Sequence, residues 1–275
     1  MRMGSVPQSL PSVFVSHGAP TLAVESNSTT DFLKRLGREL ERPEAVLCVS
    51  AHWDTPAPAV SAAERPETIH DFGGFSEELY RIRYPAPGAP ALAARVAELL
   101  GSAGFACVVE RDRGLDHGAW VPMRLLYPDA DVPVAQLSVQ PQLDTRHHFR
   151  VGRALAPLGD EGVLVLATGS ATHNLRRIEL GGGGDAPEWA AQFDEWLYGK
   201  VREGSVEELL DYRRHAPHAA TAHPTDEHLL PFFVALGAGA EGDDARGRSL
   251  HRGWTHGSLS MAAYSFGEGV VRDAG

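Results

Sequence analysis

Cysteine is nearly absent from this chain, whose 275 residues contain only Cys48 and Cys107. Two thiols cannot build a disulfide framework or supply a cysteine-rich metal site. Both lie in short apolar runs, VLCVS and FACVV, which is typical of small buried side chains in a reducing compartment. The sequence therefore predicts a fold that is stabilised by its hydrophobic core rather than by cross-links.

Long apolar runs and an excess of basic residues are also missing. No stretch approaches the roughly 20 apolar residues of a membrane helix, and the N-terminal MRMGSVPQSL has no signal-peptide core. The 25 Lys and Arg residues are outnumbered by 36 Asp and Glu, for a net charge of −11. A nucleic-acid surface needs clustered basic residues. We therefore expect a soluble, cytoplasmic protein that binds neither nucleic acid nor membrane.

What the chain does contain is an alternation of β-branched runs and amphipathic helical patterns. Its length and its hydrophobic content of 43% suffice for one large α/β domain, expected over residues 1–275. The alternation predicts a mostly parallel central sheet flanked by helices, with the active site at the C-terminal ends of the strands. Strands are expected at 12–16, 45–50, 105–109, 132–139, 163–168 and 258–266, helices at 29–41, 89–101, 119–126, 144–157, 186–202 and 224–237, and loops at 181–185 and 240–249.

Local signals agree with several of these helix boundaries. Pro90 suits the first turn of its helix, Asp144 suits an N-cap, and Gly101 suits a helix end.

Three histidines follow three of the expected strands. His17 comes after 12–16, His52 after 45–50, and His173 after 163–168 by a short turn. In open α/β sheets, ligands bind beyond the carboxyl ends of parallel strands. Neutral imidazoles that meet there are a common environment for a divalent transition metal. The sequence therefore predicts a metal site at this edge of the sheet.

A fourth histidine comes from the segment HPTDEHLLPFFVALG at 223–237, where a helix is expected to begin near Pro224. His223 and His228 are five residues apart, so they do not share a helical face as an i, i+4 metal pair would. The apolar residues after His228 would fix that helix in the core. We therefore favour His228 over His223 as the residue that reaches the metal.

The segment RGLDHGAWVPM contributes a further candidate, His117. Asp116 could orient this imidazole or cap the following helix, and the flanking glycines, Gly114 and Gly118, would let the backbone approach a ligand. Tyr84 lies at the end of a loop, 62–88, that could form a pocket wall. Asp116, Tyr84 and His223 are our candidates for substrate contact.

Six segments in order resemble the class III extradiol ring-cleaving dioxygenases, in the branch of 4,5-DOPA dioxygenase-like proteins. They are SHGAP at 16–20, VSAHW at 49–53, HDFGGFSEELYRIRYPAPG at 70–88, GLDHGAWVPM at 114–123, THNL at 172–175 and HPTDEHLLPF at 223–232. The resemblance spans almost the whole chain. It implies a mononuclear metal centre, with Fe(II) in the active enzyme and Zn(II) as the metal of purified or crystallised protein.

The resemblance also implies roles for particular residues. His17 and His52 would be metal ligands, His228 would stand where well-studied relatives have a glutamate, and His173 would be acid/base or a further ligand. Glu227 remains an alternative ligand or outer neighbour, and a histidine-only site leaves the +2 charge of the ion uncompensated.

The implied reaction opens the ring of a catechol with O2 to give a semialdehyde, with His173 or His117 as the base. Two alternatives stay open, a zinc-dependent hydrolase and a non-enzymatic Memo-like metal-binding protein. Helices in 186–210 could also form a contact surface in a homo-oligomer.

Overall fold

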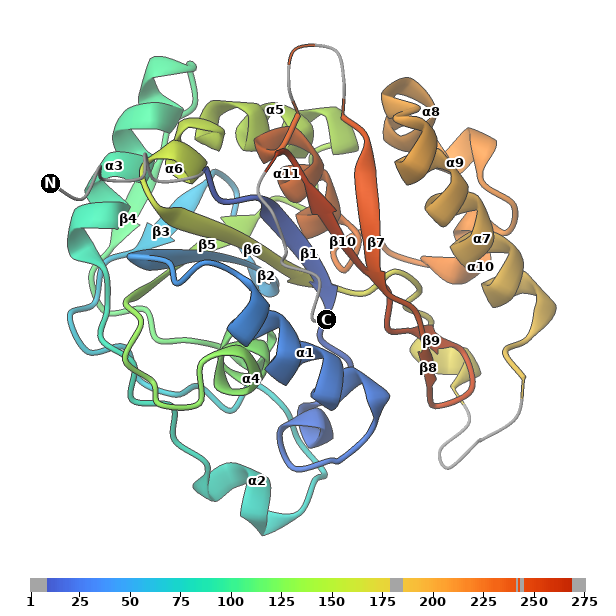
Figure 1. Ribbon diagram of the computed structural model, residues 1–275, viewed down its shortest axis with the longest axis horizontal. Coiled ribbons are helices and arrows are strands. Elements are labelled where there is room, and N and C mark those ends of the chain that lie inside the picture. The colour runs from blue at the N-terminus through green and yellow to red at the C-terminus, as the bar shows by residue number, and fades with distance from the viewer. Residues whose placement is uncertain (1–8, 179–184, 241, 243–244, 269–275) are drawn as a thin grey trace, which may run out of the picture.

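The computed structural model describes residues 9–178, 185–240, 242 and 245–268. The loop expected at 181–185 lies outside these ranges except for Asp185, and so do 241, 243 and 244 of the loop expected at 240–249. Residues 247–249 of that second loop are instead part of strand β7. An eight-stranded sheet runs through the described residues in the order β4-β3-β5-β2-β6-β1-β10-β7 (Figure 1). Strands β8 and β9 form a separate two-stranded sheet. The strands are β1 Ser12–Ser16, β2 Ala45–Asp54, β3 Ala59–Ser61, β4 Val108–Glu110, β5 Val134–Val139, β6 Val163–Gly169, β7 Gly247–His251, β8 Trp254–Thr255, β9 Leu259–Ser260 and β10 Ala263–Phe266.

The middle of the sheet is parallel. Strands β5, β2, β6 and β1 pair in parallel, whereas β10 and β7 continue antiparallel at one end and β3 pairs antiparallel with β5 at the other. The predicted α/β fold with a mostly parallel sheet is therefore confirmed. The carboxyl ends of β1, β2 and β6 meet at one edge.

Strand residues alternate between two hydrophobic cores, one on each face of the sheet. Val13 and Val15 of β1 pack into one core together with Cys48 of β2, while Phe14 and Leu47 pack into the other. Side chains in a strand point alternately to opposite faces. Because both faces are covered, these strands are apolar at nearly every position.

Helices cover both faces, as Figure 1 shows. Helices α1, α2 and α4 with the short η1 lie on one face, and α3, α5, α6 and α11 lie on the other, with α7 to α10 beyond β7. The helices are η1 Pro20–Ala23, α1 Ser28–Glu39, α2 Glu77–Arg81, α3 Pro90–Ser102, α4 His117–Leu126, α5 Thr145–Leu155, α6 Pro157–Asp160, η2 Leu175–Arg177, α7 Glu188–Glu203, α8 Val206–Leu210, α9 Tyr212–His215, α10 Ala219–Ala222 and α11 Leu230–Ala238. No helix in the described part of the chain has the length and apolar character needed to cross a membrane.

Several element boundaries differ from the prediction. Strand β2 continues four residues past 50, so His52 lies within the strand. The strand expected at 105–109 is instead β4 at the sheet edge, where all three residues are exposed, and Cys107 just before it is only partly buried. The strand expected at 258–266 is divided into β9 and β10. Gly101 lies inside α3, and the turn after that helix uses Gly104, whose φ is +85°.

Two side chains, Asp144 and His148, fix the start of α5 and its connection to β5. The carboxylate of Asp144 accepts a hydrogen bond from the His147 amide and so caps α5, as predicted. The buried His148 then joins α5 to the end of β5, since its Nδ1 donates to the Asp144 carbonyl at 2.8 Å and its Nε2 accepts from the Gln140 amide at 3.1 Å. Burial lowers the pKa of His148 to about 4.

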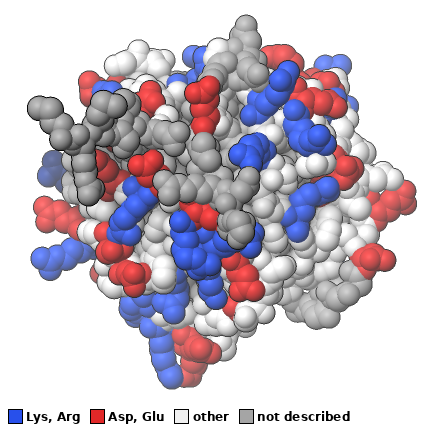
Figure 2. Space-filling view, in the orientation of Figure 1, with Lys and Arg blue, Asp and Glu red and all other residues white. Residues whose placement is uncertain are grey.

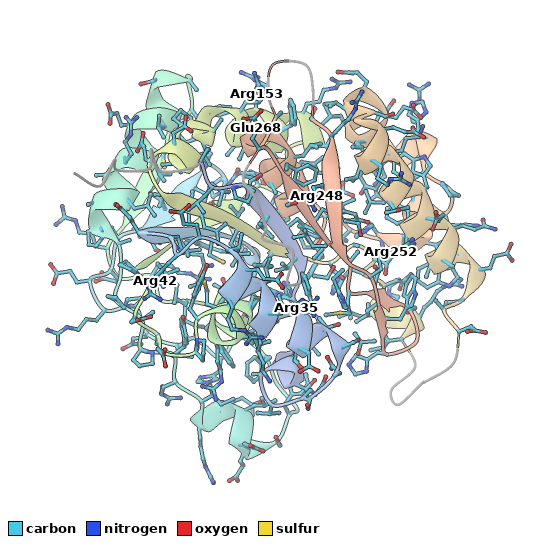
Figure 3. All side chains as sticks on the ribbon, in the orientation of Figure 1. Arg35, Arg42, Arg153, Arg248, Arg252 and Glu268 are labelled. Carbon is cyan, nitrogen blue, oxygen red and sulfur yellow. The ribbon has the colours of Figure 1, made fainter. Side chains whose placement is uncertain are left out.

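Acidic and basic side chains are interspersed on the face shown in Figure 2. In Figure 3, Arg252 lies between the C-terminal strands and α7, where it forms an ion pair with the buried Asp194 at 2.7 Å.

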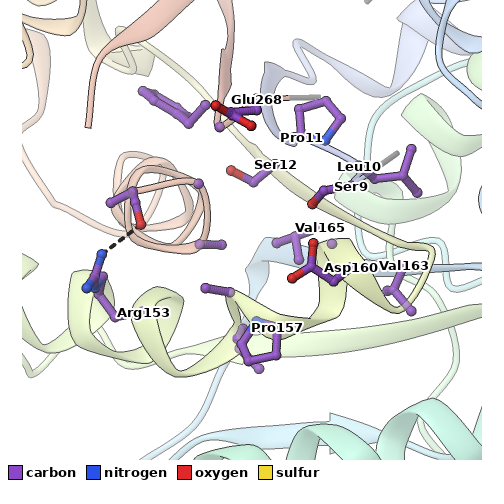
Figure 4. Close-up of a pocket in the computed structure, with 18 of the residues that line it drawn as sticks. Ser9, Leu10, Pro11, Ser12, Arg153, Pro157, Asp160, Val163, Val165 and Glu268 are labelled. Atoms are coloured by element: carbon purple, nitrogen blue, oxygen red, sulfur yellow. Dashed lines mark hydrogen bonds between the residues drawn. The ribbon is translucent and has the colours of Figure 1, made fainter. Parts of the chain in front are cut away.

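A cavity of about 550 Å³ opens where β1 and β6 begin (Figure 4). There Arg153 donates to the Ala240 carbonyl at 2.7 Å.

We expect the neutral His148 to make the free energy of unfolding depend on pH. The unfolded chain takes up a proton on this side chain near pH 6.5, whereas the folded protein does so only near pH 4. Stability is therefore lost as the pH falls through that window, by up to about 1.4 kcal/mol per pH unit for this group. Urea denaturation between pH 7.5 and 5 should show a shallower dependence in His148→Gln. An identical slope in both proteins would contradict this account.

Candidate metal centre

The imidazoles of His17, His52 and His228 converge at the carboxyl edge of the parallel strands. The Nε2 atom of His52 lies 3.0 Å from Nε2 of His17 and 3.3 Å from Nε2 of His228. His17 is 2% exposed and His228 is 7% exposed, while the side chain of His52 is 21% exposed, so the cluster is largely buried. Residues from β2 and from segments far apart in sequence thus present three nitrogens to one point.

These distances fit a bound divalent ion. Two imidazole nitrogens that bind one Zn²⁺ at about 2.0–2.1 Å with a tetrahedral angle stand about 3.3 Å apart. Such a set of three neutral nitrogen donors is suited to zinc or iron. Burial, and then the nearby imidazoles, keep the pKa of His17 and His228 well below the ordinary value. Burial followed by His117 lowers the pKa of His52 to about 3. All three rings are therefore neutral at pH 7, with a lone pair available.

His228 reaches this point from a turn rather than from a helix. The helix expected over 224–237 begins only at Leu230, and residues 224–229 form turns. The reason is that Asp226 is bound by Tyr212 and Arg213, which holds its segment outside the helix. The His228 carbonyl accepts from the Ser170 amide at 2.8 Å.

Gly169 allows that close approach of the His228 turn to the end of β6. A Cβ atom at this position would stand 2.1 Å from the carbonyl oxygen of His228.

His173 lies directly against His228. The two rings are stacked, with centroids 3.4 Å apart and planes 10° from parallel. Burial lowers the pKa of His173 to about 4, although Glu227 nearby acts in the opposite direction. His173 is partly exposed, so its neutral ring borders the open side of the cluster.

His117 is held by Asp71 rather than by Asp116. Its Nδ1 lies 3.0 Å from Asp71 Oδ2, and its amide donates to Asp71 Oδ1 at 2.9 Å. The His117 and His52 ring centroids are 3.9 Å apart. In the sequence, Asp71 is one residue of the loop 62–88, which was expected to form a pocket wall. The sequence signal is the segment HDFGG itself, which places a carboxylate on the loop before α2.

Asp116 is the N-cap of α4, which was the second of the two roles considered for this residue. It caps α4 through the Ala119 amide, and it also accepts hydrogen bonds from Ser50 at 2.6 Å and from Gln136. Ser50 in turn accepts from the amide of His52 at 3.2 Å. The start of α4 is therefore tied to β2 at Ser50, two residues before the candidate ligand His52.

The space beside Gly114 and Gly118 is filled by other residues of the protein. A Cβ atom at Gly118 would stand 2.5 Å from Ser50 Oγ and 2.9 Å from the His52 ring, and one at Gly114 would stand 2.3 Å from the Glu67 carbonyl oxygen. The expectation that these glycines let the backbone approach a ligand is thus wrong. Their role is to let the segment around α4 pack against β2 and the loop before α2.

The three residues considered for substrate contact have internal partners instead. His223 is fully buried, with Nε2 2.9 Å from the Ala171 carbonyl oxygen. Tyr84 is 1% exposed and donates to the Tyr127 carbonyl at 3.0 Å. Asp116 is fully buried in the network described above. In this structure none of these three side chains faces the open side of the histidine cluster, because each is used to hold the fold.

The fold and the cluster together define an α/β protein with a candidate metal centre at the carboxyl edge of its parallel strands. Comparison with known proteins is consistent with this description. Residues 10–267 match the family described as the catalytic LigB subunit of aromatic ring-opening dioxygenase. The chain belongs to this family of class III extradiol dioxygenases, in the 4,5-DOPA dioxygenase-like branch, and is an extradiol ring-cleaving dioxygenase.

Individual relatives match over most of their length. A 4,5-DOPA dioxygenase extradiol of Beta vulgaris is 44% identical over 268 residues, which cover 96% of this chain and 99% of the relative. The protein of that name from Escherichia coli K12 is 42% identical over 233 residues, covering 83% and 85%. The crystal structure of an uncharacterized protein of Escherichia coli K12, JW3007, superposes with a TM-score of 0.79 at 37% identity, covering 94% of this chain and 100% of that one.

The close packing at Gly118 should be required for metal binding. We expect Gly118→Ala to displace Ser50 and the His52 ring and to weaken Zn²⁺ binding about 10–100-fold, as changes that misplace ligands commonly do. Gly101→Ala is the matched control, since a Cβ atom there meets nothing within 4 Å. It should keep the parent affinity and unfold no more easily. Equal Zn²⁺ affinity in Gly118→Ala, measured by chelator competition, would contradict the proposed packing role.

Proposed function

We propose that His17, His52 and His228 hold one divalent metal ion, at which this dioxygenase opens the ring of DOPA or a related catechol. The observation that supports this most is the convergence of three neutral Nε2 atoms at a shielded strand edge, in a chain of the extradiol family. In the overall reaction, the bond between one hydroxyl-bearing carbon and its outer neighbour breaks. Both atoms of O2 enter the product, which is a ring-opened semialdehyde.

The metal would be Fe(II) in the working enzyme, with Zn(II) the ion most easily acquired on purification. Neutral imidazoles suit both ions. When bound, the ion supplies a positive charge that favours the ionised catechol, and iron also carries electrons between the two reactants.

His173 is the residue that we propose as the base for the catechol hydroxyl. It is neutral at pH 7 because burial lowers its pKa to about 4, so one ring nitrogen has a free lone pair. Its stacking on His228 holds it beside the cluster, at a fixed orientation. A proton taken up there would be stabilised by Glu227, whose charge raises the pKa of His173.

His117 would act from the other side of the cluster. Its Nδ1 lies 3.0 Å from a carboxylate oxygen of Asp71, which favours a proton on Nδ1. The opposite nitrogen, Nε2, is then the atom that can exchange a proton with substrate or hydrogen-bond a developing oxyanion. The Phe72 ring stands 5.7 Å from this imidazole, edge to face, and forms an apolar wall beside it.

The test is oxygen uptake after anaerobic reconstitution with Fe(II). With DOPA or another member of a catechol panel, we expect one O2 consumed per catechol and a yellow ring-opened product. His17→Ala and His52→Ala should lose the metal. His173→Gln should keep it while kcat falls about 10²–10⁴-fold, the usual contribution of a general base.

The surface variant His215→Ala is the control, because this side chain is exposed and its charged neighbour is Asp211. Stoichiometric metal in His17→Ala would refute the ligand assignment. An iron-loaded protein that consumes no O2 with any catechol would refute the proposed reaction, and would favour a zinc hydrolase or a metal-binding protein without activity.

A further inference from the structure

Two carboxylates lie against the outer nitrogens of the candidate metal ligands. Asp71 Oδ2 is 3.6 Å from Nδ1 of His52, and Glu227 Oε1 is 3.2 Å from Nδ1 of His228. Both contacts are on the side of the ring opposite the converging Nε2 atoms. Two of the three rings therefore have an acidic neighbour at the atom that a metal would leave free.

This arrangement favours one tautomer of each ring, through a hydrogen-bond contact between Glu227 and His228 and through the charge of Asp71 at 3.6 Å from His52. A neutral imidazole carries a single proton, and a carboxylate beside Nδ1 favours the form in which that nitrogen is the donor. The Nε2 lone pair is then directed toward the cluster. In metal sites such an outer carboxylate both orients the ligand and makes it more basic.

The position of Asp71 is set by the backbone. The loop that carries it pairs with the segment before α4, since the Ile69 amide donates to the Leu115 carbonyl and the Leu115 amide donates to the Glu67 carbonyl, both at 2.8 Å. The indole of Trp120 also donates to the Ile69 carbonyl at 2.9 Å. Asp71 Oδ1 then accepts from the His117 amide. The carboxylate is thus held between two imidazoles, His117 and His52.

The Glu227 side chain is held by a contact within its own turn and is partly exposed. Its Oε1 accepts a hydrogen bond from the Thr225 hydroxyl at 2.8 Å, within the same turn that presents His228. Its side chain is 22% exposed. A change here should disturb the contact with His228 without removing a buried part of the fold.

The two carboxylates also supply charge that the three histidines do not. Three neutral histidines bring no negative charge, so the +2 of a bound ion would be uncompensated within the ligand set. Asp71 and Glu227 place two negative charges one imidazole away. We propose that these two carboxylates are positioning residues that fix the ligand tautomers of His52 and His228 and together perform the electrostatic task of the carboxylate ligand that this site lacks. This inference rests on the proposed three-histidine metal site.

The experiment measures metal affinity rather than turnover. Zn²⁺ binding to Asp71→Asn, Glu227→Gln and the double variant is followed by chelator competition, and Co²⁺ absorption spectra report the ligand set. Each single change should weaken Zn²⁺ binding about 10–100-fold, with a larger loss in the double variant. The Co²⁺ spectrum should keep its shape in Glu227→Gln because no ligand has been removed. Asp71→Glu should recover part of the affinity that Asp71→Asn loses.

The controls separate this role from a structural one and from failure of the proposed function. Asp129→Asn removes an exposed carboxylate and should bind Zn²⁺ like the parent. The metal-free Glu227→Gln protein should unfold at the same urea concentration as the metal-free parent. If Asp71→Asn does not fold, the Zn²⁺ affinity of Glu227→Gln still tests the proposal. Parent-like affinity in Glu227→Gln would overturn the proposal. A Co²⁺ spectrum of Glu227→Gln that shows the loss of a ligand would also overturn it, because Glu227 would then be a ligand itself. Tight Zn²⁺ binding without catechol turnover would instead refute only the proposed reaction.

Discussion

The close approach of three uncharged imidazoles is the constraint on which the rest of this structure depends. His17, His52 and His228 bring their Nε2 atoms to separations of 3.0 and 3.3 Å, which protonated rings would not tolerate. Burial keeps their pKa values low, and the parallel strands bring their chain segments to one edge. A site of this kind is neutral and donor-rich when empty, so a divalent cation is the natural group to join its nitrogens.

The surrounding residues act mainly on the shape and charge of this cluster. Asp116 and Ser50 fix β2 just before His52, and the absence of a side chain at Gly118 and Gly169 lets α4 and the His228 turn approach the strands. The cavity of about 550 Å³ lies at the other end of the strands, and the residues described around it include none of the histidines. The converging nitrogen donors, and not this cavity, therefore mark the candidate site.

Much of the fold, and the elements that carry the site, could be predicted from the sequence. Strands of the parallel core are short β-branched runs, and a histidine at or just beyond a strand end is visible as such in SHGAP and VSAHW. The partnership of Asp71 with His117 could not be predicted, because 46 residues separate them and the contact depends on how the loop before α2 pairs with the segment before α4. The start of α11 could not be predicted either, because it depends on the binding of Asp226 by Tyr212 and by Arg213, which is 13 residues earlier in the chain. Tyr84 looked like a pocket residue because aromatic composition does not reveal which way a side chain points.

The central claim is that one metal ion is held by three imidazole nitrogens while the nearby carboxylates stay outside the ligand set. A crystal structure of the metal-loaded protein, with anomalous scattering recorded at the absorption edge of the metal, tests it most directly. The expected result is a single peak about 2.0–2.2 Å from Nε2 of His17, His52 and His228, with Asp71 and Glu227 contacting only the outer nitrogens. A peak coordinated by the Glu227 or Asp71 carboxylate, or one placed away from His17, would contradict the account.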